Sequence, residues 1–151
     1  MEEAINAQIN AEFWSAYLYL SMSCDFARKG LKGMANWFSI QFREEQDHAR
    51  MLMDHVLARG GKVALAPIAE VPSAWDSPLA AFEDTLKHEK SVTARIDALC
   101  ELAAAEKESF TWTDDMQSDL DELLSTLKTT AKNAGYSYKN YIKAMYGNLV
   151  T

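Results

Sequence analysis

Glycine and proline, the residues that most often interrupt regular structure, are confined to a few places in this chain of 151 residues. The interior breaks lie at Gly30 and Gly33, at Gly60 and Gly61, at Pro67, Pro72 and Pro78, and at Gly135. Between them, apolar residues recur at the spacing of one helix face, and only residues 63–66 resemble a short strand. The pattern therefore predicts an all-α fold.

These breaks divide the chain into four expected helices, a long connection and a tail. The helices cover about residues 2–29, 32–60, 77–107 and 114–133, and the tail covers 136–151, which could form a short amphipathic helix. A few residues separate the first two helices, so we expect an antiparallel hairpin. The irregular stretch 61–76 is long enough to run the length of a bundle. One domain over residues 1–151 is expected.

The composition argues against several classes of function. With 15 basic and 22 acidic residues, the net charge of -7 opposes nonspecific binding to nucleic acid or to anionic membranes, and it favours cations. The sequence shows neither a secretory signal nor a membrane-spanning run of roughly 20 apolar residues. Cys24 and Cys100 form no close ligand pair and are interpreted as small core residues. A cytoplasmic protein is expected.

The inward faces of the first three helices contain carboxylates where a packed bundle needs apolar residues. The stripes read Ile5, Ile9, Glu12, Ala16, Tyr19, Ser23 and Phe26; Met34, Phe38, Gln41, Glu45, His48, Leu52 and His55; and Phe82, Leu86, Glu89, Thr93, Ile96 and Cys100. An isolated buried carboxylate costs several kcal/mol, so three of them need a shared counter-charge. Glu45 and His48, three residues apart, can reach one ion, and a divalent metal would satisfy all four polar residues.

Oxygen ligands with a single imidazole suit Fe(II), Mn(II) or Zn(II), and an open site rich in carboxylates suits redox iron in particular. The alternative is that these glutamates are solvated or paired with Arg or Lys, which is usual for a single glutamate on a helix. For that alternative to hold, a solvated or paired glutamate would have to occur by chance near the midpoint of each of three helices. His55 and His88 are more typical of satisfied or exposed histidines than of ligands.

The same residues resemble a known family, the bacterial non-haem ferritins, over residues 2 to about 107. The matching stretches are Asn10-Ala11-Glu12-Phe13-Trp14 with Leu18-Tyr19-Leu20, Glu44-Glu45-Gln46-Asp47-His48, Trp75-Asp76-Ser77-Pro78-Leu79, and His88-Glu89. The resemblance implies a ferritin-like four-helix bundle with one long crossover between its second and third helices. It also implies a homo-oligomeric shell of about 24 subunits that stores ferric mineral.

The resemblance further implies a di-iron centre within each subunit, and no haem. One iron would be held by Glu12, Glu45 and His48, and the other by Glu45 and Glu89. Tyr19 would lie near the pair, and Glu44 matches a position that helps to hold a third iron.

The fourth helix departs from the family pattern, which places a glutamine and a glutamate three residues apart facing the site. Without gaps these places fall on Glu122 and Ser125, and in the other alignment they fall on Thr113 and Met116. Neither alignment restores the pair. The second iron is therefore expected to have fewer ligands unless Glu122 or Asp119 turns inward, and Glu122 is the candidate ligand from this helix.

The sequence thus predicts a ferroxidase, an enzyme that oxidises Fe(II) with dioxygen or peroxide for storage, with the altered fourth helix reducing its activity. Two alternatives stay open. One is a metal-binding or structural ferritin subunit with an incomplete site. The other is a different di-iron carboxylate oxidase, although such enzymes usually carry a second Glu-x-x-His motif.

Overall fold

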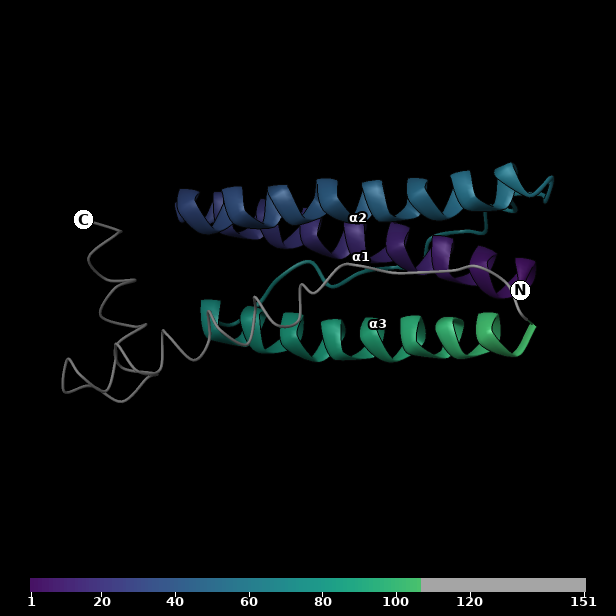
Figure 1. Cartoon of the computed structure of the whole chain (residues 1–151). Helices are drawn as coiled ribbons and strands as arrows, with labels where there is room; N and C mark the ends of the chain where they lie inside the picture. The colour runs from purple at the N-terminus through teal and green to yellow at the C-terminus, as the bar shows by residue number, and fades with distance from the viewer. Residues whose placement is uncertain (107–151) are drawn as a thin grey trace. The chain divides into compact units, whose positions relative to one another are not determined.

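The computed structural model describes residues 1–106. Within them the chain forms three helices, α1 (Glu2–Arg28), α2 (Lys32–Ala58) and α3 (Pro78–Glu106), and no strand, so residues 63–66 are irregular (Figure 1). This confirms the all-α fold class. The expected fourth helix at 114–133, the tail at 136–151 and the candidate ligand Glu122 lie outside the described residues.

Glycines in the left-handed region end both α1 and α2. Gly30 has φ 77° and Gly60 has φ 72°, values that residues with a Cβ rarely adopt. At the end of α1, the N–H of Leu31 donates to the carbonyl of Phe26 at 2.9 Å and that of Gly30 to Ala27 at 3.0 Å. The same pair of bonds closes α2, where the N–H groups of Gly61 and Gly60 donate backwards. Both ends are therefore Schellman motifs, which satisfy carbonyls that the helix leaves open.

The helices α1 and α2 pack side by side as an antiparallel hairpin (Figure 1). Stacked aromatic rings join them, with ring centroids 5.9 Å apart for Tyr19 and Phe38 and 5.4 Å apart for Phe26 and Phe38. All three rings are fully buried. Near the turn, the hydroxyl of Ser23 donates to the carbonyl of Ala35 at 2.7 Å. This packing fixes the register of the two helices that carry Glu12, Glu45 and His48.

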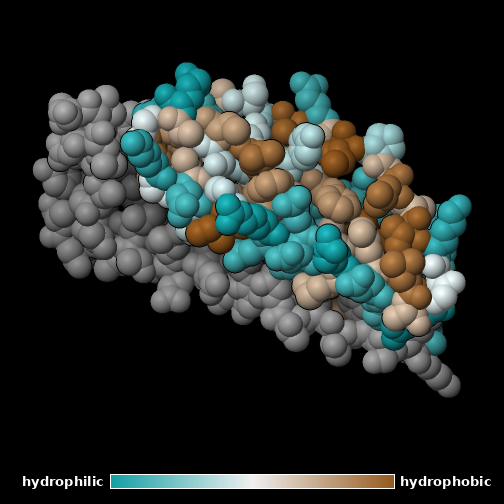
Figure 2. Space-filling model, turned by 90° about the horizontal axis from the view of Figure 1, so that it is seen from above, coloured by the Kyte–Doolittle hydropathy of each residue, from teal (hydrophilic) through white to brown (hydrophobic). Residues whose placement is uncertain are grey.

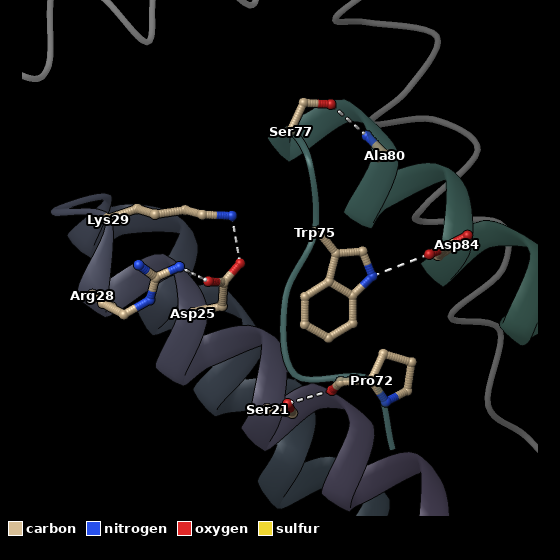
Figure 3. A network of polar contacts seen from close by, with 9 residues as sticks. All are labelled: Ser21, Asp25, Arg28, Lys29, Pro72, Trp75, Ser77, Ala80 and Asp84. Carbon is tan, nitrogen blue, oxygen red and sulfur yellow. Dashed lines mark hydrogen bonds and ion pairs between the residues drawn. The ribbon is translucent and has the colours of Figure 1, made fainter. Parts of the chain in front are cut away.

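The segment after α2 runs back along α1, and three side chains of α1 hold it in order. The amide of Asn6 donates to the carbonyl of Lys62 at 2.9 Å and accepts from the N–H of Ala64 at 2.8 Å. Further along, the indole of Trp14 donates to the carbonyl of Glu70 at 3.3 Å. The hydroxyl of Ser21 donates to the carbonyl of Pro72 at 2.6 Å (Figure 3). The crossover therefore runs parallel to α1, from Asn6 in its second turn to Ser21.

The described residues fall into two compact units, 1–74 with 94–106, and 75–93. In the second unit, the N–H of Ala80 donates to the hydroxyl of the N-cap residue Ser77 at 3.1 Å. The indole of the buried Trp75 donates to Asp84 at 3.0 Å (Figure 3). The bond to Ser77 caps α3, which begins at Pro78 as the Ser-Pro pair predicts.

The sequence also makes predictions about the exposure of the two cysteines and the polarity of the helices. Cys24 is exposed and Cys100 is half-buried, so the interpretation of Cys24 as a core residue was wrong. Position 24 lies next to Ser23, which contacts α2, and is not itself part of the inward stripe. None of the helices α1 to α3 is both long and apolar enough to cross a membrane.

Asp25 near the end of α1 is a buried charge with two cationic partners. Its side chain is 0% exposed and accepts from Arg28 at 2.7 Å and from Lys29 at 2.5 Å (Figure 3). Asp25→Ala should lower the free energy of unfolding by about 3 kcal/mol, because it leaves Lys29 partly buried without its counter-charge. Arg28→Ala is the matched control, and with a side chain 70% exposed it should cost under about 1 kcal/mol.

Urea unfolding at matched protein concentration measures both variants. Equal losses of stability in the two would show that burial of Asp25 does not decide the strength of this contact.

Candidate metal centre

Three of the six predicted ligands, Glu12, Glu45 and His48, meet between the middle of α1 and the middle of α2. Glu12 is 0% exposed and Glu45 is 2% exposed, and the side chain of His48 is 12% exposed. One ligand atom from each residue lies within 4.8 Å of the corresponding atom of the other two. Nδ1 of His48 is 3.4 Å from Oε2 of Glu45. A single ion placed among them could contact all three.

Within residues 1–106, the group of three ligands does not include the remaining predicted site residues. Glu89 is 4% exposed on the part of α3 that belongs to the 75–93 unit, and its convergence with the three ligands stays a prediction. Tyr19 is fully buried two turns after Glu12 on α1. Glu44 is exposed beside Glu45. His55 and His88, which were not chosen as ligands, are half-buried.

Glu12 carries the unusual electrostatics of the site. Burial first, and then the negative charge of Glu45, together raise the pKa of Glu12 from 4.5 to about 8, although Gln8 and His48 act in the opposite direction. Gln8 donates from Nε2 to Oε1 of Glu12 at 2.7 Å. The second oxygen, Oε2, is buried and has no hydrogen-bond partner among residues 1–106. Buried oxygens are rarely left in this state, and a cation would satisfy this one.

Two buried amides lie near these ligands; sequence reasoning missed Gln8 and placed Gln41 on the inward face of its helix without giving it a role. Gln8, 2% exposed, precedes Glu12 by one turn, and Gln41, 7% exposed, precedes Glu45 by one turn. Oε1 of Gln41 also lacks a hydrogen-bond partner within the described residues. The spacing of four residues before each glutamate was the available signal. The donor set of two carboxylates and one imidazole fits Fe(II), Mn(II) or Zn(II) by its chemistry.

Comparison with known proteins places the chain in a family. The family model described as a ferritin-like domain matches residues 2–134. A bacterial non-heme ferritin of Bacteroides fragilis is 45% identical over 111 residues, which cover 74% of this chain and 70% of that protein. A chloroplastic ferritin of Phaseolus vulgaris is 38% identical over 114 residues, covering 71% of this chain and 45% of that protein.

Solved structures agree with this assignment. An open pore ferritin from the archaeon Archaeoglobus fulgidus has a TM-score of 0.78 and 38% identity, covering 99% of this chain and 95% of that one. An engineered closed form of the same ferritin has the same TM-score, with 94% of that chain covered. The family match extends beyond residue 107, into the stretch where the fourth helix was expected. With helices, ligand geometry and relatives in agreement, this chain belongs to the ferritin family.

Proposed function

We propose that this protein stores iron by binding Fe(II) at Glu12, Glu45 and His48, oxidising it to Fe(III) and passing it to a ferric mineral. The observation that carries the proposal is the buried convergence of these three side chains, with Oε2 of Glu12 lacking a partner in the described part of the chain. Iron is the substrate and cargo here. The protein holds it and orients its ligands, and the net charge of -7 draws cations in.

Oxidation needs an electron acceptor, for which dioxygen or peroxide is proposed. Two Fe(II) and one dioxygen, with two protons, give two Fe(III) and one hydrogen peroxide. Two iron ions held together would supply both electrons at once. Glu45 is the proposed bridge between them, with Glu89 binding the second ion and Tyr19 lying nearby. Glu44 and Glu122 are proposed as further iron ligands. A cytoplasmic location is proposed for the protein.

A homo-oligomer is in keeping with the ferritin family, and a closed shell of about 24 subunits is the finer proposal. Apolar side chains on the surface of the 1–74 unit support association of the subunits. Figure 2 shows apolar side chains in brown gathered among hydrophilic ones on one face. The exposed large apolar residues are Tyr17, Ile40, Met51, Leu57, Leu65 and Ile68. Such a surface is suited to contact with other subunits.

Aerobic iron loading tests the function. The full-length chain is sized by light scattering and then given Fe(II) in portions well above two per subunit. Iron that co-elutes with a particle of shell mass, at many ions per subunit, is the expected result. Iron that stops at one or two ions per chain on a small particle would instead favour the structural subunit or the di-iron oxidase.

A further inference from the structure

Gln8 and Glu12 lie one turn apart on α1 and are joined by a hydrogen bond. Gln8 is 2% exposed, and its Nε2 donates to Oε1 of Glu12 at 2.7 Å. An amide has a donor end and an acceptor end of nearly the same shape, so either end could face the carboxylate. Only the NH₂ end attracts an ionised Glu12, because the oxygen end would oppose one lone pair to another. The orientation of Gln8 therefore decides how well Glu12 serves as an anionic ligand.

Arg95 determines that orientation. It belongs to the part of α3 that falls in the same unit as α1. Its Nε donates to Oε1 of Gln8 at 2.9 Å, and its Nη2 donates to the carbonyl of Ala7 at 3.2 Å. A guanidinium offers donors only and stays protonated. Because Arg95 cannot accept, the oxygen of Gln8 must face Arg95 and its NH₂ must face Glu12.

We propose that Arg95 is a positioning residue for the iron site: through Gln8 it keeps Oε1 of Glu12 engaged and leaves Oε2 for the metal. The inference rests on the proposed function. Oε2 is the atom that lacks a hydrogen-bond partner within residues 1–106, as an oxygen reserved for a cation would. Partners that orient metal ligands typically change metal affinity by about 10–100-fold. Arg95 is exposed, which places the expected effect near the lower figure.

Co(II) titration of the full-length chain tests the role of Arg95, because the visible absorption of bound Co(II) reports both affinity and ligand geometry. Arg95→Met should weaken Co(II) binding about 10-fold and change the absorption bands. Arg95→Lys, whose ammonium also only donates, should keep the affinity of the parent within about threefold. Should Arg95→Met not fold, Arg95→Gln takes its place, since a neutral amide can present either end to Gln8 and should cause the same loss.

Gln8→Met completes the design. In that background the Arg95 substitution should cause no further loss, because the path from Arg95 to Glu12 is already broken. Arg50→Met, which removes another exposed arginine, is the control and should bind Co(II) like the parent. Parent-like affinity and spectrum in Arg95→Met, or an undiminished loss on top of Gln8→Met, would overturn the inference. Failure of the parent to bind Co(II), or binding untouched by Glu45→Ala, would refute the proposed function instead.

Discussion

The double variant Glu45→Ala with His48→Ala loses rapid oxidation of Fe(II) while its helices stay intact. Glu45 and His48 supply two of the three converging side chains, so only Glu12 of that group remains in the variant. Loss of direct ligands should exceed the roughly 10–100-fold effect of altering an outer partner. The measurement is the initial rate of Fe(III) formation under air, corrected for the protein-free rate, with circular dichroism to verify the helices.

The matched control removes the same chemical types from the same helix. Asp47→Ala with His55→Ala takes away an exposed carboxylate and a half-buried imidazole outside the proposed site. It should oxidise Fe(II) at nearly the parent rate. Similar rates in the two double variants would show that oxidation does not depend on Glu45 and His48.

Glu12→Gln stabilises the metal-free protein at alkaline pH but weakens its binding of metal. The pKa of Glu12 is about 8 in the folded chain and 4.5 in the unfolded chain. Between these two pH values, the folded chain keeps a proton on Glu12 that the unfolded chain has released. The stability of the metal-free protein should therefore fall as the pH rises from about 4.5 to about 8, and then level off. The slope is at most about 1.4 kcal/mol per pH unit, so the accumulated loss is a few kcal/mol.

Glutamine is neutral at every pH, so Glu12→Gln should remove this part of the pH dependence. Urea unfolding in the presence of a chelator, at several pH values, measures the effect. Glu44→Gln is the control, since it makes the same change at an exposed neighbouring position and should behave like the parent. If the free energy of unfolding falls equally with pH in the parent and in Glu12→Gln, ionising the buried Glu12 does not destabilise the folded protein as predicted.

Metal affinity should depend on pH in the opposite direction to stability, because it rises as Glu12 loses its proton. Fe(II) needs the ionised carboxylate of Glu12, so binding near neutral pH should displace its proton and tighten as the pH approaches 8. On the proposed function, the same buried group lowers the stability of the metal-free protein and would provide an oxygen for the cation. That role would account for a carboxylate at a core position of α1.

The helices were largely predictable because their ends depend on local chemistry. The helix α1 ends at Arg28, one residue before its predicted end, and α2 ends at Ala58, two residues early. In both cases a glycine with positive φ closes the last turn. Ser77 and Pro78 mark the start of α3 in the same local way. Such signals need no knowledge of the rest of the fold.

The face of α3 was only half predictable. Phe82, Glu89 and Ile96 are buried as expected, but Thr93 is exposed. Thr85 is buried in addition, and its hydroxyl donates to the carbonyl of Ala81 at 2.8 Å. That local bond removes the cost of burying the hydroxyl, and a hydropathy pattern does not register it.

The site shows the same division. Glu12, Glu45 and His48 could be chosen from one sequence because a carboxylate on an apolar stripe needs a reason to be there. The contact of Arg95 with Gln8 joins positions 87 apart along the chain and exists only after folding. Periodicity within one helix carries no information about such a pair.

Anomalous diffraction at the iron edge, from crystals of the protein soaked anaerobically with Fe(II), tests the central claim most directly. The account predicts a peak in bonding contact with Oε2 of Glu12, a carboxylate oxygen of Glu45 and a ring nitrogen of His48. Absence of iron there, with these side chains paired to Arg or Lys, would contradict it.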